Sequence, residues 1–274
     1  MATTIFLVNP QTFPSSTSYL LDTYSAAAAY SLRQLKTGVT NVVRVRRSSD
    51  NAESDFTADE ITDGTLTTWT GANDGFVVTW YDQSGNAVDA TQSTAGSQPQ
   101  IVSSGSVITK GSLPAVDFVS SDRMQTSTTS IMDDASLPIS IFSVSSADST
   151  ETVGAIVSGN NTQFRQFCDS RTTPNRNIGV NTVYANMSTA RVDTNQRLLS
   201  GFIDASYNMS SFDNGATGGT ATAGTWASSA LELGAQGSST YLNGKIQEVI
   251  VFNSDESSNR TAIESDINTY YSIY

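Results

Sequence analysis

The sequence of 274 residues contains no histidine and a single cysteine, Cys168. These absences exclude Ser-His-Asp and Cys-His catalysis, histidine-ligated zinc and any disulfide within the chain. Positive charge is also scarce: the chain has 14 Lys and Arg residues and 26 Asp and Glu residues. The net charge of -12 argues against nucleic acid and anionic membrane surfaces as partners. Catalysis would have to rest on carboxylates, Tyr, Ser or Lys.

Long hydrophobic runs are missing from the start of the chain. Met1–Pro10 lacks a basic region, and its apolar run, Ile5–Val8, is too short for a signal peptide or a membrane span. We therefore expect no export signal and no membrane insertion. Such a protein acts in the cell that makes it, or leaves by a route without a signal, such as a virus particle released by lysis.

Serine and threonine are abundant, and their 76 positions suit short strands and turns better than long helices. Asp213-Asn214-Gly215 predicts a hairpin, and the Gly/Thr/Ala-rich segment 216–225 predicts a mobile loop. Short β-branched and aromatic runs bounded by Gly, Asn, Asp or Pro predict an all-β fold. The predicted strands are 41–47, 76–81, 115–119, 139–145, 153–157, 164–167, 198–204, 207–212, 231–234 and 245–252.

Two helices are predicted. The first covers Leu21–Leu35, which is rich in helix formers and stops before Gly38. The second ends the chain and is capped by Ser254 or Asp255. Its apolar stripe, which we expect to lie on the sheet, consists of Ile263, Ile267, Tyr270 and Tyr271.

Several segments resemble known families. Residues 241–253 and the helix after them resemble the end of concanavalin A-like jelly rolls of the laminin G and pentraxin kind. Tyr81–Asn86 also resembles part of the catalytic domain of fungal arabinofuranosidase B. The front half resembles a module of bacteriophage virion and fibre proteins, at 27–33, 43–51, 80–86, 89–92, 98–102 and 113–118.

These resemblances imply a fold and a division of the chain. The fold is an all-β, concanavalin A-like jelly-roll β-sandwich with a short N-terminal helix and a C-terminal helix. The sandwich covers 20–274, and 1–19 form an N-terminal arm. Because the same fold carries lectins, glycan hydrolases and structural modules, function has to be argued from sites.

Carboxylates provide little sign of a catalytic pair. A glycosidase needs two carboxyl groups that flank the scissile bond. Glu248 stands alone on its predicted strand, and Glu53, Glu151 and Glu232 show no spacing typical of such pairs. The catalytic Glu and Asp of arabinofuranosidase B match no residue here. We therefore expect no enzymatic activity, with an arabinofuranosidase-like glycoside hydrolase as the third hypothesis.

The densest polar cluster follows the predicted strand 76–81. Asp82, Asn86 and Asp89 offer oxygen ligands for calcium, and Gly85 permits a sharp bend. The same residues also fit an Asx-type turn, in which the side chains bond their own backbone. We favour the turn and expect no cofactor, with calcium as the alternative.

Two other groups are candidates for binding. Trp226, Trp69, Arg44 and Arg46 could contact a glycan, by ring stacking or by bidentate hydrogen bonds. For the arginines we favour pairing with nearby acidic residues, and we place Trp80 in the core. The arm residues Ile5, Phe6, Leu7 and Val8 form either an edge strand or an anchor on a neighbouring virion protein.

The leading hypothesis is a non-enzymatic phage virion surface protein, a fibre, decoration or receptor-binding subunit that contacts a glycan. The alternative is a purely structural capsid or tail decoration protein. We expect other virion proteins and host-surface polysaccharide as partners, a homo-oligomer on the particle, and location in the virion.

Overall fold

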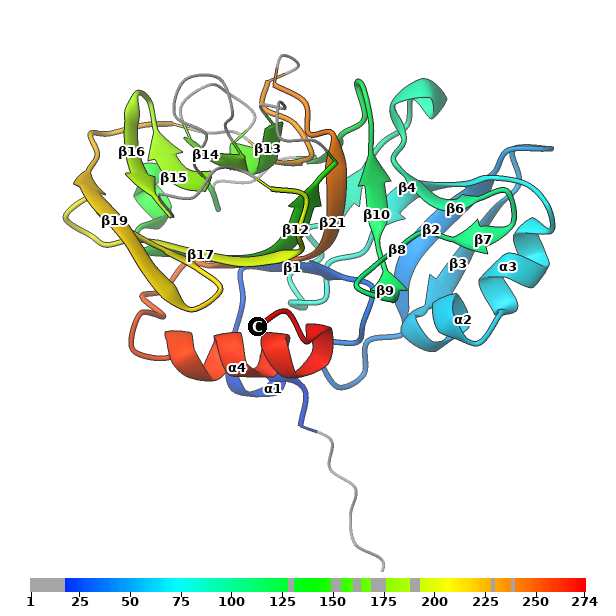
Figure 1. The fold of residues 1–274 in the computed structure, drawn as a ribbon, viewed down its shortest axis with the longest axis horizontal. Helices are drawn as coiled ribbons and strands as arrows, with labels where there is room; N and C mark the ends of the chain where they lie inside the picture. The colour runs from blue at the N-terminus through cyan, green and yellow to red at the C-terminus, as the bar shows by residue number, and fades with distance from the viewer. Residues whose placement is uncertain are drawn as a thin grey trace, which may run out of the picture.

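The structure is a computed structural model that describes residues 18–127, 131–148, 154–159, 164–168, 176–187, 193–227, 230–237 and 240–274, with the backbone alone at 164–168. Two antiparallel layers pack face to face, and helices cover the outer face of one of them (Figure 1). The all-β sandwich with a C-terminal helix that the sequence predicts is confirmed.

The first layer, which we call the helix-side sheet, is centred on β21 (Gly244–Phe252). One edge of β21 pairs with β12 (Ile139–Ala147) along its whole length. The other edge pairs with β1 (Ala28–Ser31) and β10 (Val116–Phe118), which lie end to end. Beyond β12 follow β17 (Arg197–Ile203), β18 (Asn208–Asp213) and β19 (Ala216–Thr222).

The second layer, which we call the polar-face sheet, holds the shorter strands. Their order is β3 (Glu53–Thr57), β2 (Asn41–Arg47), β4 (Gly75–Trp80), β5 (Ala90–Thr91), β11 (Met124–Thr126), β20 (Leu231–Leu233), β13 (Gly154–Gly159), β14 (Phe164–Cys168), β15 (Arg176–Val180) and β16 (Val183–Asn186). β6 (Gln100–Ser103) pairs with both β4 and β10 and so joins the two layers. Three minor strands complete the β structure: β7 (Ser106–Val107), β8 (Thr109–Lys110) and β9 (Leu113–Pro114).

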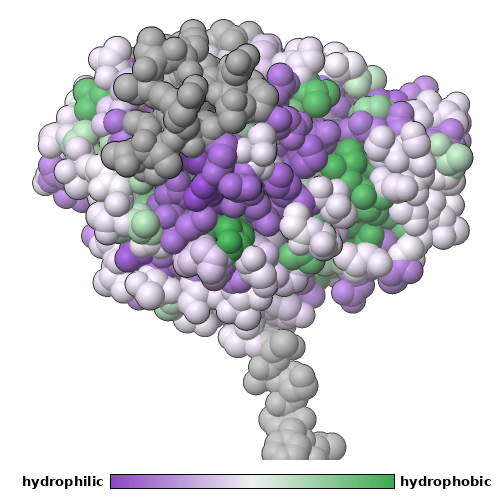
Figure 2. Space-filling model, viewed as in Figure 1, coloured by the Kyte–Doolittle hydropathy of each residue, from purple (hydrophilic) through white to green (hydrophobic). Residues whose placement is uncertain are grey.

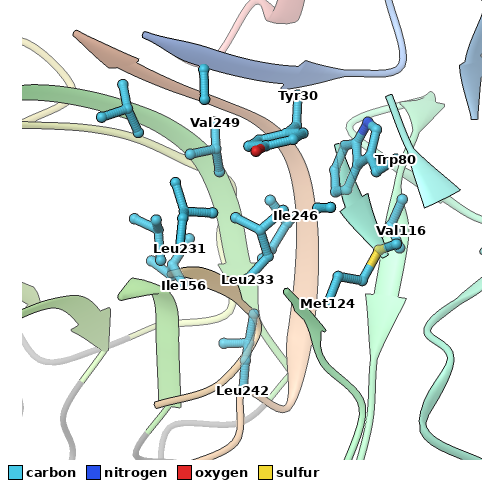
Figure 3. Close-up of a cluster of buried hydrophobic side chains, with 14 of the residues drawn as sticks. Tyr30, Trp80, Val116, Met124, Ile156, Leu231, Leu233, Leu242, Ile246 and Val249 are labelled. Atoms are coloured by element: carbon cyan, nitrogen blue, oxygen red, sulfur yellow. The ribbon is translucent and has the colours of Figure 1, made fainter. Parts of the chain in front are cut away.

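The main core lies between the two sheets and follows from period-2 alternation along the strands. In β2, Val43 and Val45 are fully buried, whereas Arg44 between them and Arg46 after them are partly exposed. Tyr30 from β1 meets Trp80 from β4 edge to face, with 6.3 Å between ring centroids. Figure 3 shows this cluster, to which both sheets contribute.

A second core lies between the helix-side sheet and two helices, α1 (Leu20–Thr23) and α4 (Arg260–Tyr271). Phe142 and Phe252 from the sheet meet edge to face beneath Ile267 of α4. Three members of the predicted apolar stripe, Ile263, Ile267 and Tyr271, are buried as expected, whereas the fourth, Tyr270, is 38% exposed. Four further short helices are α2 (Ala58–Thr62), α3 (Thr65–Thr70), η1 (Ala95–Ser97) and η2 (Asp134–Ser136).

Three local predictions are wrong. The predicted helix Leu21–Leu35 is replaced by α1 and β1, because pairing with β21 buries Ala28–Ser31 completely and outweighs the helix propensity of alanine. Residues 216–222 form β19 rather than a loop, since Gly218 lets the strand approach β16: a Cβ there would lie 2.5 Å from the Met187 carbonyl oxygen. The helix α4 begins after Asn259, not after Ser254 or Asp255.

Two smaller findings complete the fold. The predicted hairpin is confirmed, because Asn214 and Gly215 connect β18 to β19 with positive φ angles of 49° and 76°. None of the helices within the described residues has the length and apolar character that crossing a membrane requires.

Candidate active site on the polar-face sheet

The tryptophans proposed from the sequence are packed against protein. Trp226 is 4% exposed and donates its Nε1–H to the Met132 carbonyl oxygen at 2.8 Å. The expectation of an exposed ring there is wrong, because the segment before it forms a strand. Trp69 is half-buried and packs on Phe56, with the Arg47 guanidinium 4.7 Å from its ring centroid. Trp80 lies in the core, as predicted.

The arginine cluster on β2 forms contacts with its own neighbours. Arg44 bonds both carboxylate oxygens of Asp55, at 2.7 and 2.9 Å. Arg46 donates to Gln98 at 2.7 Å and to Asn51 at 2.9 Å. The favoured interpretation, pairing with nearby acidic residues, agrees with the contacts of Arg44 but not with those of Arg46, which bonds two amide side chains.

The polar block after β4 contains the favoured Asx turn at Asp82, whose Oδ1 accepts from the backbone N–H of Ser84 at 2.9 Å, but Asn86 bonds the distant carbonyls of Ala26 and Ala27 rather than its own backbone. Both carboxylate oxygens of Asp82 accept hydrogen bonds, from the N–H groups of Ala29 and Val88 among others. Asp89 accepts from the backbone of Asp82, and Asn86 donates to backbone carbonyls. Among the described residues no group of three or more Cys, Asp or Glu lies close enough to hold a metal ion.

Two other sets of candidate residues lie outside the described residues. These are the arm residues Ile5–Val8 and the carboxylate Glu151. The roles considered for them therefore stay predictions.

A row of polar side chains crosses the polar-face sheet at right angles to its strands. Cross-strand pairing aligns Thr79 with Thr91, Thr91 with Gln125, Gln125 with Glu232, and Glu232 with Ser158. Because side chains alternate along each strand, the residues on either side of Glu232 point into the core. The row therefore lies on the outer face of the sheet, away from the helices.

The same face carries an exposed aromatic ring near its far edge. Gly179 of β15 pairs with Tyr184 of β16, and Tyr184 is 36% exposed. A Cβ on Gly179 would lie 2.5 Å from Cδ1 of Tyr184, so the glycine lets the ring rest on the sheet.

Glu232 is the buried carboxyl group in this row. It is 1% exposed, and its Oε1 accepts a hydrogen bond from Arg123 Nη1 at 3.2 Å. Its Oε2 accepts from the backbone N–H of Gly237 at 2.7 Å, in the loop that folds over β20. Burial raises the pKa of Glu232, and these two hydrogen bonds only partly oppose it. A buried carboxyl of this kind holds its proton at a higher pH than an exposed one.

A polar hollow of about 380 Å³ lies on the same face. Glu232 is not one of its lining residues but contacts one of them, Arg123. Arg123, whose side chain is 32% exposed, lines the hollow and reaches Glu232. The other lining residues are Thr91, Gln92, Ser93, Thr94, Gln125, Thr126 and Ser127. Uncharged hydroxyl and amide groups dominate, and these groups exchange hydrogen bonds with sugar hydroxyls. In Figure 2 most of the face in view is of intermediate hydropathy, with hydrophilic residues gathered near its centre and hydrophobic residues in separate patches.

This site places a buried carboxyl group with a raised pKa close to a polar surface. No second carboxyl group contacts Glu232 within the part of the chain that the structure describes. The sequence contained one signal for Glu232, since the pattern Leu-Glu-Leu places a carboxyl on the face opposite two core leucines. The alignment with Gln125 could not be predicted, because β5 and β11 are too short to show a register.

No protein-family profile and no curated protein sequence matches the chain. Solved structures do match. A GH54 α-L-arabinofuranosidase soaked with a cyclic sulfate inhibitor has a TM-score of 0.66 at 15% identity. A mutant GH54 enzyme soaked with 4-nitrophenyl α-L-arabinofuranoside has a TM-score of 0.67 at 15% identity. An arabinofuranosidase complexed with arabinofuranosyl-α-1,2-xylobiose has a TM-score of 0.67 at 14% identity.

Each of these matches covers 88% of this chain and 62% of the arabinofuranosidase chain. The chain thus spans less than two thirds of those proteins. At this level of identity the similarity concerns the fold. It supports the part of the resemblance that pointed to arabinofuranosidase B, and none of the comparisons supports a laminin G-like or bacteriophage module.

The comparisons correct the leading functional hypothesis. The sequence suggested a non-enzymatic phage virion protein, but the structural neighbours are glycoside hydrolases and none of the findings supports a virion or fibre role. The third hypothesis, an arabinofuranosidase-like hydrolase, fits these neighbours better. The expected partners, oligomeric state and location stay predictions.

Proposed function

We propose that the chain is a glycoside hydrolase domain of the arabinofuranosidase type. Its substrate glycan occupies the polar hollow on the polar-face sheet, and Glu232 donates a proton to the glycosidic oxygen. The observation that carries this proposal is the Glu232 carboxyl, whose pKa burial raises and which contacts Arg123 and pairs across strands with Gln125, two residues that line the polar hollow. The fold shared with arabinofuranosidases supports it.

The contacts of Glu232 suit a general acid. As the bond between the anomeric carbon and the glycosidic oxygen breaks, the Glu232 carboxyl gives its proton to that oxygen, and Arg123 stabilises the carboxylate that remains. A water molecule adds to the anomeric carbon, and the proton that it loses returns to Glu232. Gln125, the cross-strand neighbour of Glu232, lines the hollow and can hydrogen-bond sugar hydroxyls. Access to the carboxyl requires the loop at Gly237 to release its N–H from Oε2.

Release of 4-nitrophenol from 4-nitrophenyl α-L-arabinofuranoside by the purified protein tests the proposal. We expect turnover by the wild type and a loss of about 10²-fold or more in Glu232→Gln, the usual size of a general-acid contribution. Glu53→Gln is the matched control, because Glu53 is an exposed glutamate on β3. It should leave turnover unchanged.

The substrates tested should include furanosides and pyranosides of neutral sugars. Failure of the wild type to release 4-nitrophenol from any of them would overturn the hydrolase proposal, even if oligosaccharide binding were retained. Full turnover of an unactivated substrate, such as an arabinofuranoside linked to xylobiose, by Glu232→Gln would remove this residue from the role of acid.

A further inference from the structure

A second hollow lies on the other side of the sandwich, among α1, α2 and α4. Its volume is about 360 Å³, within the usual range of small-molecule sites. Its residues are Ser18, Tyr19, Leu20, Arg33, Gln34, Ala58, Asp59, Thr62, Asp266 and Tyr270. In Figure 1 α1 and α4 lie beneath the helix-side sheet, opposite β13 to β16, and α2 lies to their right, below β3. The polar-face site does not include this hollow.

Arg33 is fixed at the base of this hollow. Its Nε and Nη2 donate to the two carboxylate oxygens of Glu248 at 2.8 and 3.1 Å, and Nη2 also donates to Asp266 at 2.8 Å. The ring centroid of Tyr270 lies 5.0 Å from the guanidinium carbon. With a side chain only 12% exposed, Arg33 is held in one orientation before any ligand arrives.

One nitrogen of Arg33, Nη1, takes no part in these hydrogen bonds. Within the described residues Nη1 has no hydrogen-bond partner, and it is not one of the buried polar atoms that lack partners. Its N–H groups are therefore accessible from the hollow. A rigid guanidinium that keeps unused donors beside an open hollow is suited to bind oxygen atoms of a ligand.

The charges around the hollow indicate whether the ligand that supplies these oxygen atoms is anionic or neutral. Arg33 is the only cation among the lining residues, and it stands against Asp59, Asp266 and the underlying Glu248. One positive charge against three negative charges disfavours an anionic ligand. Hydroxyl groups both donate and accept, so they can bond Nη1 and the exposed carboxylates together.

The rim of the hollow adds two aromatic rings, Tyr19 and Tyr270. Tyr270 is 38% exposed and Tyr19 is half-buried. Tyrosines at the rim of a polar hollow supply contact area for the C–H groups of a sugar ring and lose little conformational entropy on binding.

From these contacts we infer a second carbohydrate-binding site in this hollow, for a neutral sugar residue held by Arg33, Asp266 and Tyr270. The ligand class agrees with the proposed function, but the inference requires no hydrolysis at Glu232. A site on the opposite side of the sandwich would hold a second stretch of a polysaccharide or a second chain.

Titration of the ¹⁵N-labelled full chain with xylobiose and with arabinofuranosyl-α-1,2-xylobiose, followed at the Nε–H resonance of Arg33, tests the inference. We expect either sugar to shift this resonance in the wild type and equally in Glu232→Gln, so that failure of the hydrolase proposal leaves this result standing. Glucuronic acid should shift it less than the neutral sugars.

Two variants and a control locate the binding. Tyr270→Ala and Asp266→Asn should each weaken sugar binding by about ten-fold, or 1.4 kcal/mol. Tyr274→Ala removes another exposed tyrosine, 54% exposed, outside the hollow and should leave binding unchanged. Asp266→Asn keeps the test valid if Tyr270→Ala fails to fold.

Three results would overturn the inference. One is an Arg33 resonance that neither sugar shifts. Another is a stronger response to glucuronic acid, which would indicate an anion site. The third is a nuclear Overhauser contact between the Arg33 Nε–H and residues 1–17 without sugar, which would make the N-terminal segment the occupant.

Discussion

Two buried glutamates, each 1% exposed, lie on the two sheets of the sandwich and are bonded very differently. On the helix-side sheet, Glu248 accepts two hydrogen bonds from Arg33 and one from the Ser31 hydroxyl, at 2.8 to 3.1 Å. On the polar-face sheet, Glu232 accepts one from Arg123 at 3.2 Å and one from a backbone N–H. The two glutamates are therefore equally buried, but Glu248 has a dense hydrogen-bond network and Glu232 a sparse one.

The difference follows from the strands that carry them. Glu248 lies in β21, a nine-residue strand bordered on both edges, where neighbouring strands and α4 supply partners. Glu232 lies in β20, a strand of three residues that runs into a glycine-rich loop. A short strand beneath a loop offers few hydrogen-bond donors to the carboxyl group that it carries. Such a carboxyl group contributes little to stability, but it can take part in proton transfer.

Loss of the arginine beneath α4 should have the largest effect on stability. Arg33→Ala leaves Glu248 buried without its ion pair, and breaking a buried pair in this way costs about 3–5 kcal/mol of the free energy of unfolding. Urea denaturation measures this loss. Arg44→Ala, which breaks a more exposed pair with Asp55, should cost about 1 kcal/mol or less. Equal losses of the free energy of unfolding in Arg33→Ala and Arg44→Ala would show that the buried pair with Glu248 matters no more than the exposed pair with Asp55.

Strain in the loop over Glu232 should have the next largest effect. Gly234 has a φ of 76°, and a Cβ there would lie 2.1 Å from Cδ1 of Phe118. Gly234→Ala should therefore lower the free energy of unfolding by about 1–3 kcal/mol, as judged by thermal denaturation. Gly96→Ala is the control, since its Cβ meets no atom within 4 Å. A loss no larger than in this control would show that the loop adapts freely.

A smaller effect should appear in the pH dependence of stability. Burial raises the pKa of Asp122, the neighbour of Arg123, to about 6, from an ordinary value of 3.8. The folded state then binds the proton more tightly than the unfolded state, so stability falls as pH rises from about 4 through 6. Asp122→Asn should flatten this decline, by on the order of 1–2 kcal/mol in denaturant titrations. A decline of unchanged slope would contradict the assignment.

The sequence predicted the framework of the fold better than its edges. Long alternating or apolar strands such as β2, β12 and β21 were predicted almost to the residue, because their periodicity is local. The alanine-rich segment around β1 and the glycine-rich β19 were missed. Only their pairing with partners distant in the sequence makes them strands.

The candidate site was visible only in part. The Asx turn at Asp82 could be predicted because its bond to the Ser84 N–H is local, and the pairing of Arg44 could be predicted from the nearby Asp55. The bond from Arg46 to Gln98, 52 positions away, could not. Glu232 appeared without a partner, since Arg123 is 109 positions away in the chain. The exposure of Trp226 was misjudged because it depends on how 216–222 fold.

The central claim is that Glu232 donates the proton that releases the glycan. The most direct test compares Glu232→Gln with the wild type on two arabinofuranosides, one with a 2,4-dinitrophenyl leaving group and one linked to xylobiose. The account predicts a loss of about 10²-fold or more in kcat/KM for the xylobiose substrate, which needs protonation, and only a small loss for the dinitrophenyl substrate. Equal losses on both substrates, or none on either, would contradict it.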